Sequence, residues 1–184
     1  MKKLFILCVF LLAGCATQTP SKTSSACSEE QACTIGDQNT VETMQPLSFE
    51  EALSFFKEKK SGLLYFGFEN CPWCQEALPI LREEAKRQNV SIHSILTRDE
   101  NNELLYTEEQ KQEIIPYLQD YMSKNEEGEL TLYVPLVVVV KDGKAIEGHV
   151  GTVDDHDAHA RKMTEEEKQE LQKKYEDMLA QLSS

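Results

Sequence analysis

Residues 63–74, LLYFGFENCPWC, join an apolar run to a pair of cysteines. The run from Leu63 to Phe68 is short and unbroken, which predicts a buried strand. Residues 75–88 are predicted to form a helix, and the cysteine pair directly before them opens it, so Cys71 lies at the helix N-terminus. Unpaired N–H groups and the helix dipole favour a thiolate there, and we expect the pKa of Cys71 to fall from about 8.5 into roughly the 3.5–7.5 range.

The spacing of Cys71 and Cys74 has three interpretations, namely a redox pair, half of a zinc site, or a stabilising disulfide. A tetrahedral zinc site needs two further ligands at a recognisable spacing, and the sequence has no second C-x-x-C and no H-x-x-x-H. The strand-then-helix setting favours the redox pair. Cys71 is then the nucleophile, Cys74 resolves the intermediate, and no cofactor is needed beyond their own disulfide.

The first residues predict export. Lys2 and Lys3 precede an apolar stretch, Leu4 to Leu12, that is too short to span a membrane but suits the h-region of a signal peptide. The stretch ends in Leu12-Ala13-Gly14-Cys15, which resembles the lipobox of bacterial lipoproteins. We therefore predict a lipoprotein signal peptide over 1–14, lipidation of Cys15 and an extracytoplasmic, lipid-anchored protein. An ordinary secretory signal is the alternative, and it implies export as well.

Residues 15–45 are polar, with few large apolar side chains, and predict a flexible tether between the anchor and a folded domain at 46–184. Cys27 and Cys33 lie within this tether. A local disulfide is the simplest expectation for them in an oxidising compartment. Exchange with Cys71 and Cys74, or unpaired or intermolecular use, are the alternatives.

Charge excludes some partners. The net charge of −13 argues against nucleic acid and against adhesion to anionic lipid, so the acyl chain would hold the protein at the membrane. About 140 residues remain after the signal and tether, enough for one domain with its own core, and we expect a monomer.

The remaining pattern alternates helix and strand, which predicts an α/β fold. Capping boxes at Ser48 with Glu51 and at Thr164 with Glu167 begin the first and last helices, and Asp142-Gly143 predicts a two-residue hairpin turn. The predicted elements are helix 48–60, strand 62–68, helix 71–88, strand 91–96, helix 107–124, strands 136–140 and 144–150, and a final helix reaching residue 182.

Several separated motifs now resemble the thioredoxin-fold thiol-disulfide oxidoreductases. Cys71-Pro-Trp-Cys-Gln-Glu-Ala-Leu-Pro79 is similar to the family's active-site helix, and Val134-Pro135 before an apolar strand is similar to its cis-proline loop. The resemblance implies a central mixed sheet flanked by helices, with a helical insertion before the cis-proline loop. The lipoprotein signal and the residues from Gly151 to His159 resemble the bacteriocin-transport-accessory group of Gram-positive bacteria.

The resemblance also implies roles in binding. Val134 would offer backbone hydrogen bonds to a substrate strand, Pro135 in cis would shape the groove, and Trp73 would present an exposed aromatic face. One position departs from the family, because Tyr65 stands where thioredoxin keeps a buried aspartate. A phenol is a poor base at neutral pH, so Glu69 or water is left as the proton acceptor for Cys74. The Pro72-Trp73 pair leaves the redox direction open.

One segment suggests a metal. Asp154 to His159, with His149 nearby, contains carboxylates and two histidines three residues apart, a set that can bind zinc or copper. Such runs are more often solvated loops, and we assign no metal.

Two functional classes remain. The first is an enzyme that exchanges disulfides in exported proteins or peptides with the help of a membrane redox partner. The second is a non-catalytic metal-handling or exporter-accessory binding protein.

Overall fold

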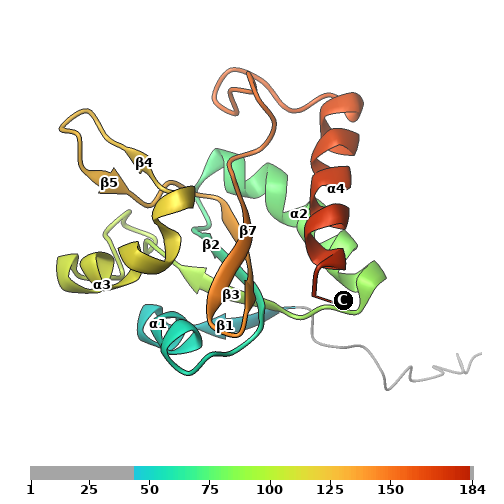
Figure 1. Cartoon of the computed structure of the whole chain (residues 1–184). Coiled ribbons are helices and arrows are strands. Elements are labelled where there is room, and N and C mark those ends of the chain that lie inside the picture. Colours follow the sequence, from blue (N-terminus) through green and yellow to red (C-terminus); the bar gives the residue numbers. More distant parts are fainter. Residues whose placement is uncertain (1–43, 183–184) are drawn as a thin grey trace, which may run out of the picture. The chain divides into compact units, whose positions relative to one another are not determined.

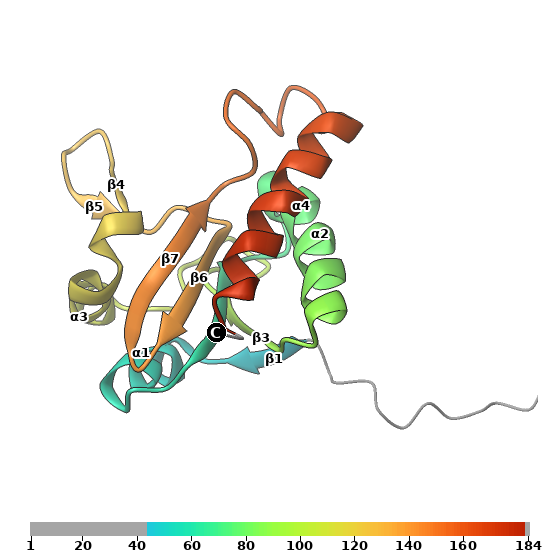
Figure 2. The same ribbon diagram turned by 45° about the vertical axis from the view of Figure 1, so that its right-hand side comes forward.

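The computed structural model describes residues 44–182 (Figures 1 and 2). The predicted signal peptide, Cys15, Cys27 and Cys33 lie outside the described residues, as does most of the predicted tether. No helix in the described part is long and apolar enough to cross a bilayer. The elements are β1 (Met44–Leu47), α1 (Phe49–Lys57), β2 (Gly62–Gly67), α2 (Pro72–Gln88), β3 (Ile92–Leu96), α3 (Glu108–Leu118), a 3₁₀ turn (Gln119–Tyr121), β4 (Ser123–Lys124), β5 (Leu130–Thr131), β6 (Leu136–Lys141), β7 (Lys144–Val150) and α4 (Glu165–Ala180).

Five strands form one mixed sheet in the order β1-β3-β2-β6-β7. β3 runs parallel to both β1 and β2, whereas β6 is antiparallel to β2 and to β7. Helices α2 and α4 cover one face of the sheet, and α1 and α3 lie on the other (Figures 1 and 2). The predicted mixed sheet flanked by helices is confirmed.

Strand β2 sits in the middle of this sheet and supplies side chains to both faces. Leu64 and Phe66 belong to the core beneath α1 and α3, while Leu63 and Tyr65 belong to the core beneath α2 and α4. All four are buried, and each large apolar side chain buried in this way contributes about 1.5–3 kcal/mol to folding. The strand therefore holds its carboxyl end, from which the Cys71 segment departs, at a fixed place.

Local signals in the sequence produce the expected ends of elements. Both predicted capping boxes form, at Ser48 with Glu51 before α1 and at Thr164 with Glu167 before α4. Asp142 and Gly143 have φ values of 51° and 72°, the positive pair that a tight hairpin of this kind requires. The predicted strand-turn-strand unit from residue 136 to residue 150 is confirmed.

Strand β1 was not predicted. Met44 and Gln45 fall at the end of the segment assigned to the tether, but they pair in parallel with Ile92 and His93 of β3. The strand is only four residues long and contains Pro46, which lacks an N–H for the ladder and is tolerated because β1 lies at the sheet edge. Met44 and Gln45, which the sequence assigned to the tether, therefore belong to the sheet.

The helix predicted over 107–124 is too long. α3 ends at Leu118, a short 3₁₀ turn follows, and Ser123–Lys124 then pairs with Leu130–Thr131 in a small separate sheet. The side chain of Asn125 accepts the backbone N–H groups of Glu127 and Glu129, which stabilises a turn in place of another helical turn. The insertion before the cis-proline loop is thus part helix and part hairpin.

Candidate active site

Cys71 caps the N-terminus of α2. Its backbone is extended, and its sulfur accepts the backbone N–H of Cys74 at 3.3 Å, in the way that a serine or aspartate caps a helix. Pro72 occupies the first turn, where a missing N–H costs nothing. Both cysteines are free thiols and both are buried, with 3% of Cys71 and 2% of Cys74 exposed. The sequence motif therefore produces the expected dithiol at a helix start.

The two thiols have opposite acidities. The hydrogen bond from the Cys74 thiol and the backbone N–H groups of Cys74 and Trp73 lower the pKa of Cys71 to about 7, although burial opposes them. The pKa of Cys74 is raised, because its thiol would lose the hydrogen bond to Cys71 on deprotonation and because burial disfavours the charge. At neutral pH the pair can therefore hold one thiolate, at Cys71, beside one thiol.

The loop before β6 lies against Cys71. The Val134–Pro135 bond is cis, as predicted, and the carbonyl oxygen of Val134 lies 3.7 Å from the Cys71 sulfur. Pro135 is buried and Val134 is partly exposed. The loop thus places the backbone of Val134 beside the reacting sulfur, where an extended substrate segment could pair with it.

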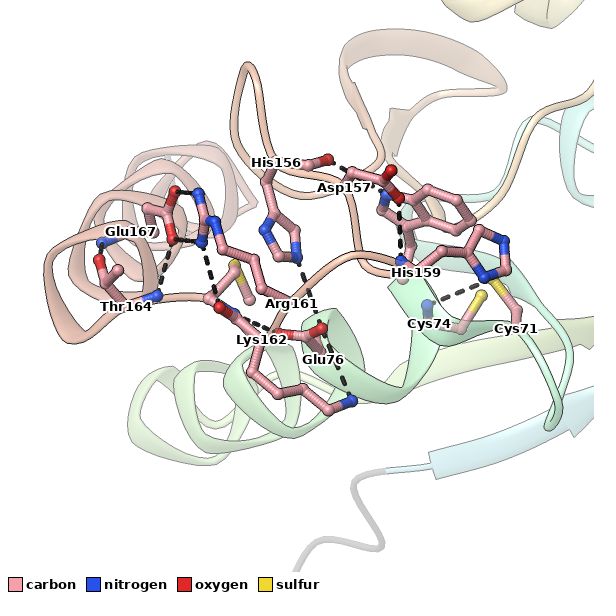
Figure 3. A network of polar contacts seen from close by, with 12 residues as sticks. Cys71, Cys74, Glu76, His156, Asp157, His159, Arg161, Lys162, Thr164 and Glu167 are labelled. Carbon is pink, nitrogen blue, oxygen red and sulfur yellow. Dashed lines mark hydrogen bonds and ion pairs between the residues drawn. The ribbon is translucent and has the colours of Figure 1, made fainter.

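Trp73 is not the free aromatic face that the sequence suggested. Its side chain is half-buried, its indole N–H donates to the backbone carbonyl of His156 at 3.4 Å, and the ring of His159 meets it edge-on at 4.7 Å. Both histidines belong to the segment between β7 and α4, residues 151–163, which we call the β7–α4 loop. This loop therefore packs on Trp73, one of the two residues between the cysteines. Figure 3 shows His156 and His159 on this loop.

Glu76 secures the same loop. Its side chain is only 6% exposed, and its carboxylate accepts the backbone N–H of Met163 at 2.7 Å and lies 3.4 Å from Nε2 of His156. The ammonium group of Lys162 lies 3.6 Å from the same carboxylate, at the surface (Figure 3). The sequence alone does not predict this contact, since nothing local marks Glu76 as buried on a helix with several other acidic residues.

Tyr65, noted from sequence only as a departure, contacts the second cysteine. It is 4% exposed, and its hydroxyl hydrogen-bonds the sulfur of Cys74. Burial, followed by the proximity of Cys74, raises the pKa of Tyr65. The phenol therefore stays protonated near neutral pH. Glu69, the carboxylate considered from sequence, is exposed.

The histidines of the suggested metal segment have separate partners. His156 is buried against Glu76, His159 lies on Trp73, and the ring of His149 contacts the carbonyl oxygen of Thr152 at 2.5 Å. Within residues 44–182, no group of three or more His, Cys, Asp or Glu side chains is arranged to hold a metal ion. The suggested ligands are thus used in holding the β7–α4 loop.

Comparisons with known proteins give likeness in structure only. No protein-family model matches the sequence, and no curated protein matches it. One similar structure, described as having a thioredoxin fold, has a TM-score of 0.42 at 12% identity, covering 77% of this chain and 95% of that one. Thioredoxin O2 from Arabidopsis thaliana has a TM-score of 0.38 at 19% identity, covering 64% of this chain and 87% of its own. Thioredoxin from Aeropyrum pernix has a TM-score of 0.38 at 19% identity, and the match covers 57% of this chain and 73% of that one.

The class of fold follows from the features of the chain itself. The sheet order, the helix pairs on its two faces, the cysteine pair that begins α2 and the cis-proline loop beside it are those of a thioredoxin-like protein. The described part of this chain has a thioredoxin-like α/β fold.

Proposed function

We propose that this protein is a thiol-disulfide oxidoreductase that acts through Cys71 and Cys74. The observation that carries the proposal is the unequal pair itself, with the pKa of Cys71 at about 7 and that of Cys74 raised, beside the backbone of Val134. A thiolate is the nucleophile in disulfide exchange, and a neighbouring thiol held at a helix start can displace the product.

The reaction has two steps. The Cys71 thiolate attacks a client disulfide, forms a bond to one client sulfur and releases the other as a thiolate. The Cys74 sulfur then attacks Cys71, closing the Cys71–Cys74 disulfide and releasing the second client thiol, so that the client gains two electrons and the protein loses two. In the oxidase direction the same steps run in reverse. Apart from this disulfide, the proposed chemistry uses no cofactor.

The setting of the reaction is part of the proposal. The signal-like residues 1–14 and the lipobox at Cys15 support an extracytoplasmic protein anchored to a bacterial membrane by lipid. Its clients would be exported proteins or peptides with cysteines, as the resemblance to the bacteriocin-transport-accessory group implies, and a membrane redox partner would reset the pair. The net negative charge argues against binding to nucleic acid, and the size of the single domain supports a monomer.

Trapping of mixed disulfides tests this function. With Cys74 replaced by alanine, the second step is impossible, so Cys74→Ala should accumulate covalent complexes with client proteins on a non-reducing gel. Cys71→Ala should accumulate none, and a Cys27→Ser/Cys33→Ser variant with both active-site cysteines intact should reduce insulin disulfides at the wild-type rate. Equal trapping by the two alanine variants would contradict the assigned roles, and a metal-handling protein would show no trapping at all.

A further inference from the structure

The second step of the proposed reaction needs a route for one proton. Cys74 is buried, and its raised pKa keeps its thiol protonated at neutral pH. Its sulfur must lose that proton while it attacks Cys71. The group that touches the sulfur from the sheet side is the Tyr65 hydroxyl, at the position where the resembling family keeps its carboxylate.

Gly67 makes this contact possible. Tyr65 and Gly67 point to the same face of β2, two residues apart, and a methyl group added at Gly67 would overlap the Tyr65 hydroxyl and the end of its ring. The missing side chain lets the phenol lie along the strand toward its carboxyl end, where Cys74 is held by α2. The position of the Tyr65 hydroxyl therefore depends on the glycine at position 67.

A cavity lies on the far side of this contact. It has a volume of about 490 Å³, and Tyr65 and Cys74 both line it. Its remaining walls come from α2 and the edge of the sheet, and exposed polar side chains, Glu69, Gln75 and Arg82, stand around it. A single water needs roughly 10–15 Å³ of such space together with polar partners, so the cavity has room for several waters, held where Tyr65, Cys74 and the exposed polar side chains line it.

We propose that the Tyr65 hydroxyl relays the proton of Cys74 to water in this cavity during the resolving step. The inference deepens the proposed function and rests on it. As the Cys74 sulfur bonds to Cys71, its proton passes to the Tyr65 oxygen and the original hydroxyl proton of Tyr65 passes to a cavity water. The bond between Cys71 and the client sulfur breaks, and that sulfur leaves with the electron pair.

A relay of this kind avoids the objection that a phenol is a poor base. Tyr65 gains one proton and gives up another in the same event, so it never exists as a phenolate. Its hydroxyl needs only one acceptor contact and one donor contact. In the reduced pair the Tyr65 hydroxyl donates to the Cys74 sulfur, and the Cys74 thiol donates to Cys71. Once Cys71 is bonded to the client sulfur, the Cys74 thiol is free to donate to the Tyr65 oxygen, and the hydroxyl then donates to a cavity water.

The two steps can be timed separately with 5,5′-dithiobis(2-nitrobenzoate), using the full chain with Cys8, Cys15, Cys27 and Cys33 replaced by serine. The first nitrothiobenzoate released reports attack by Cys71, and the second reports resolution by Cys74. Tyr65→Phe keeps the ring and removes the hydroxyl. It should leave the first release unchanged and slow the second about 100-fold at pH 7, the lower end of what a positioned proton-transfer group supplies.

The pH dependence separates a relay from a packing effect. In Tyr65→Phe the second release should recover toward the wild-type rate as the pH rises, because hydroxide then removes the proton directly. Tyr175→Phe is the matched control, since Tyr175 is a fully buried phenol near Cys74 that has no hydrogen-bond partner for its hydroxyl and does not line the cavity. It should leave both releases unchanged.

The outcomes are distinct. A second release in Tyr65→Phe at the wild-type rate and with the wild-type pH dependence would overturn the relay, as would equal slowing in Tyr175→Phe. Absence of the first release in the parent chain would instead refute the proposed function itself.

Discussion

The carboxylate of Glu76 and the imidazole of His156 lie together inside the protein, with Oε1 and Nε2 3.4 Å apart. Glu76 belongs to the active-site helix α2, and His156 belongs to the β7–α4 loop. The same loop accepts the indole N–H of Trp73. This buried pair therefore links the helix that begins at the cysteine pair to the loop that packs on Trp73.

Removing the carboxylate should loosen the loop. Glu76→Ala leaves the backbone N–H of Met163 without its acceptor and removes the carboxylate beside His156, so the free energy of unfolding should fall by about 1–3 kcal/mol. Trp73 is the single tryptophan of the chain, and its fluorescence emission should shift to longer wavelength as the ring becomes wetter. Urea unfolding and emission spectra measure the two effects.

Glu83→Ala is the control for this variant, because Glu83 lies exposed on the same helix. It should change neither the stability nor the emission by a measurable amount. If Glu76→Ala behaves like Glu83→Ala, the pair does not hold the loop.

The reactivity of Cys71 should follow its lowered pKa. The thiolate fraction rises as the pH passes through about 7, so the rate of iodoacetamide alkylation should be half-maximal there and fall to about a tenth of its maximum one pH unit below. Cys74 should stay unmodified over the same range, since its pKa is raised and its side chain is buried. Mass spectrometry of the alkylated peptide measures both, and a midpoint near 8.5 for Cys71 would show an ordinary thiol.

The Cys74 thiol should be the main cause of that acidity. Its hydrogen bond is the largest influence that lowers the pKa of Cys71, ahead of the backbone N–H groups. Cys74→Ala should therefore move the alkylation midpoint upward, whereas Cys74→Ser keeps a hydroxyl donor and should move it less. Midpoints in both variants that equal the wild-type value would assign the effect to the backbone alone.

The predicted lipid anchor at Cys15 can be tested separately. If Cys15 is the lipidated residue, Cys15→Ser should lose label when cells are grown with a radioactive fatty acid, while Cys27→Ser keeps it. Persistent labelling of Cys15→Ser would rule out the lipoprotein assignment. The fold and the chemistry of Cys71 would stand in that case.

The parts of the structure that were predictable from sequence have local causes. Ser48 with Glu51 satisfies its own helix end, and Asp142-Gly143 supplies the backbone conformation of its own turn, so neither depends on distant residues. The Cys71 motif works in the same way, because the helix that acidifies the thiol begins at the cysteine itself. For this reason the fold class and the pair of thiols could be predicted from the sequence.

The parts that were missed depend on distant partners. β1 exists because β3 offers it an edge, and the burial of Glu76 is defined by a loop 80 residues away in the sequence. The link from Tyr65 to Cys74 likewise requires β2 and α2 to be packed together. The end of α3 is different, because the Asn125 turn was present in the sequence and outweighed the helical pattern.

The redox equilibrium of the Cys71–Cys74 pair tests the central claim most directly. The purified chain, with Cys8, Cys15, Cys27 and Cys33 replaced by serine, would be equilibrated in glutathione buffers and its disulfide content measured. Stabilising the Cys71 thiolate favours the reduced form, and the buried acid of thioredoxin is replaced here by Tyr65, so we predict a reversible two-electron transition a few tens of millivolts above thioredoxin's approximately −270 mV. A midpoint at or below that value would contradict the predicted direction, and a pair that forms no reversible disulfide would contradict the oxidoreductase itself.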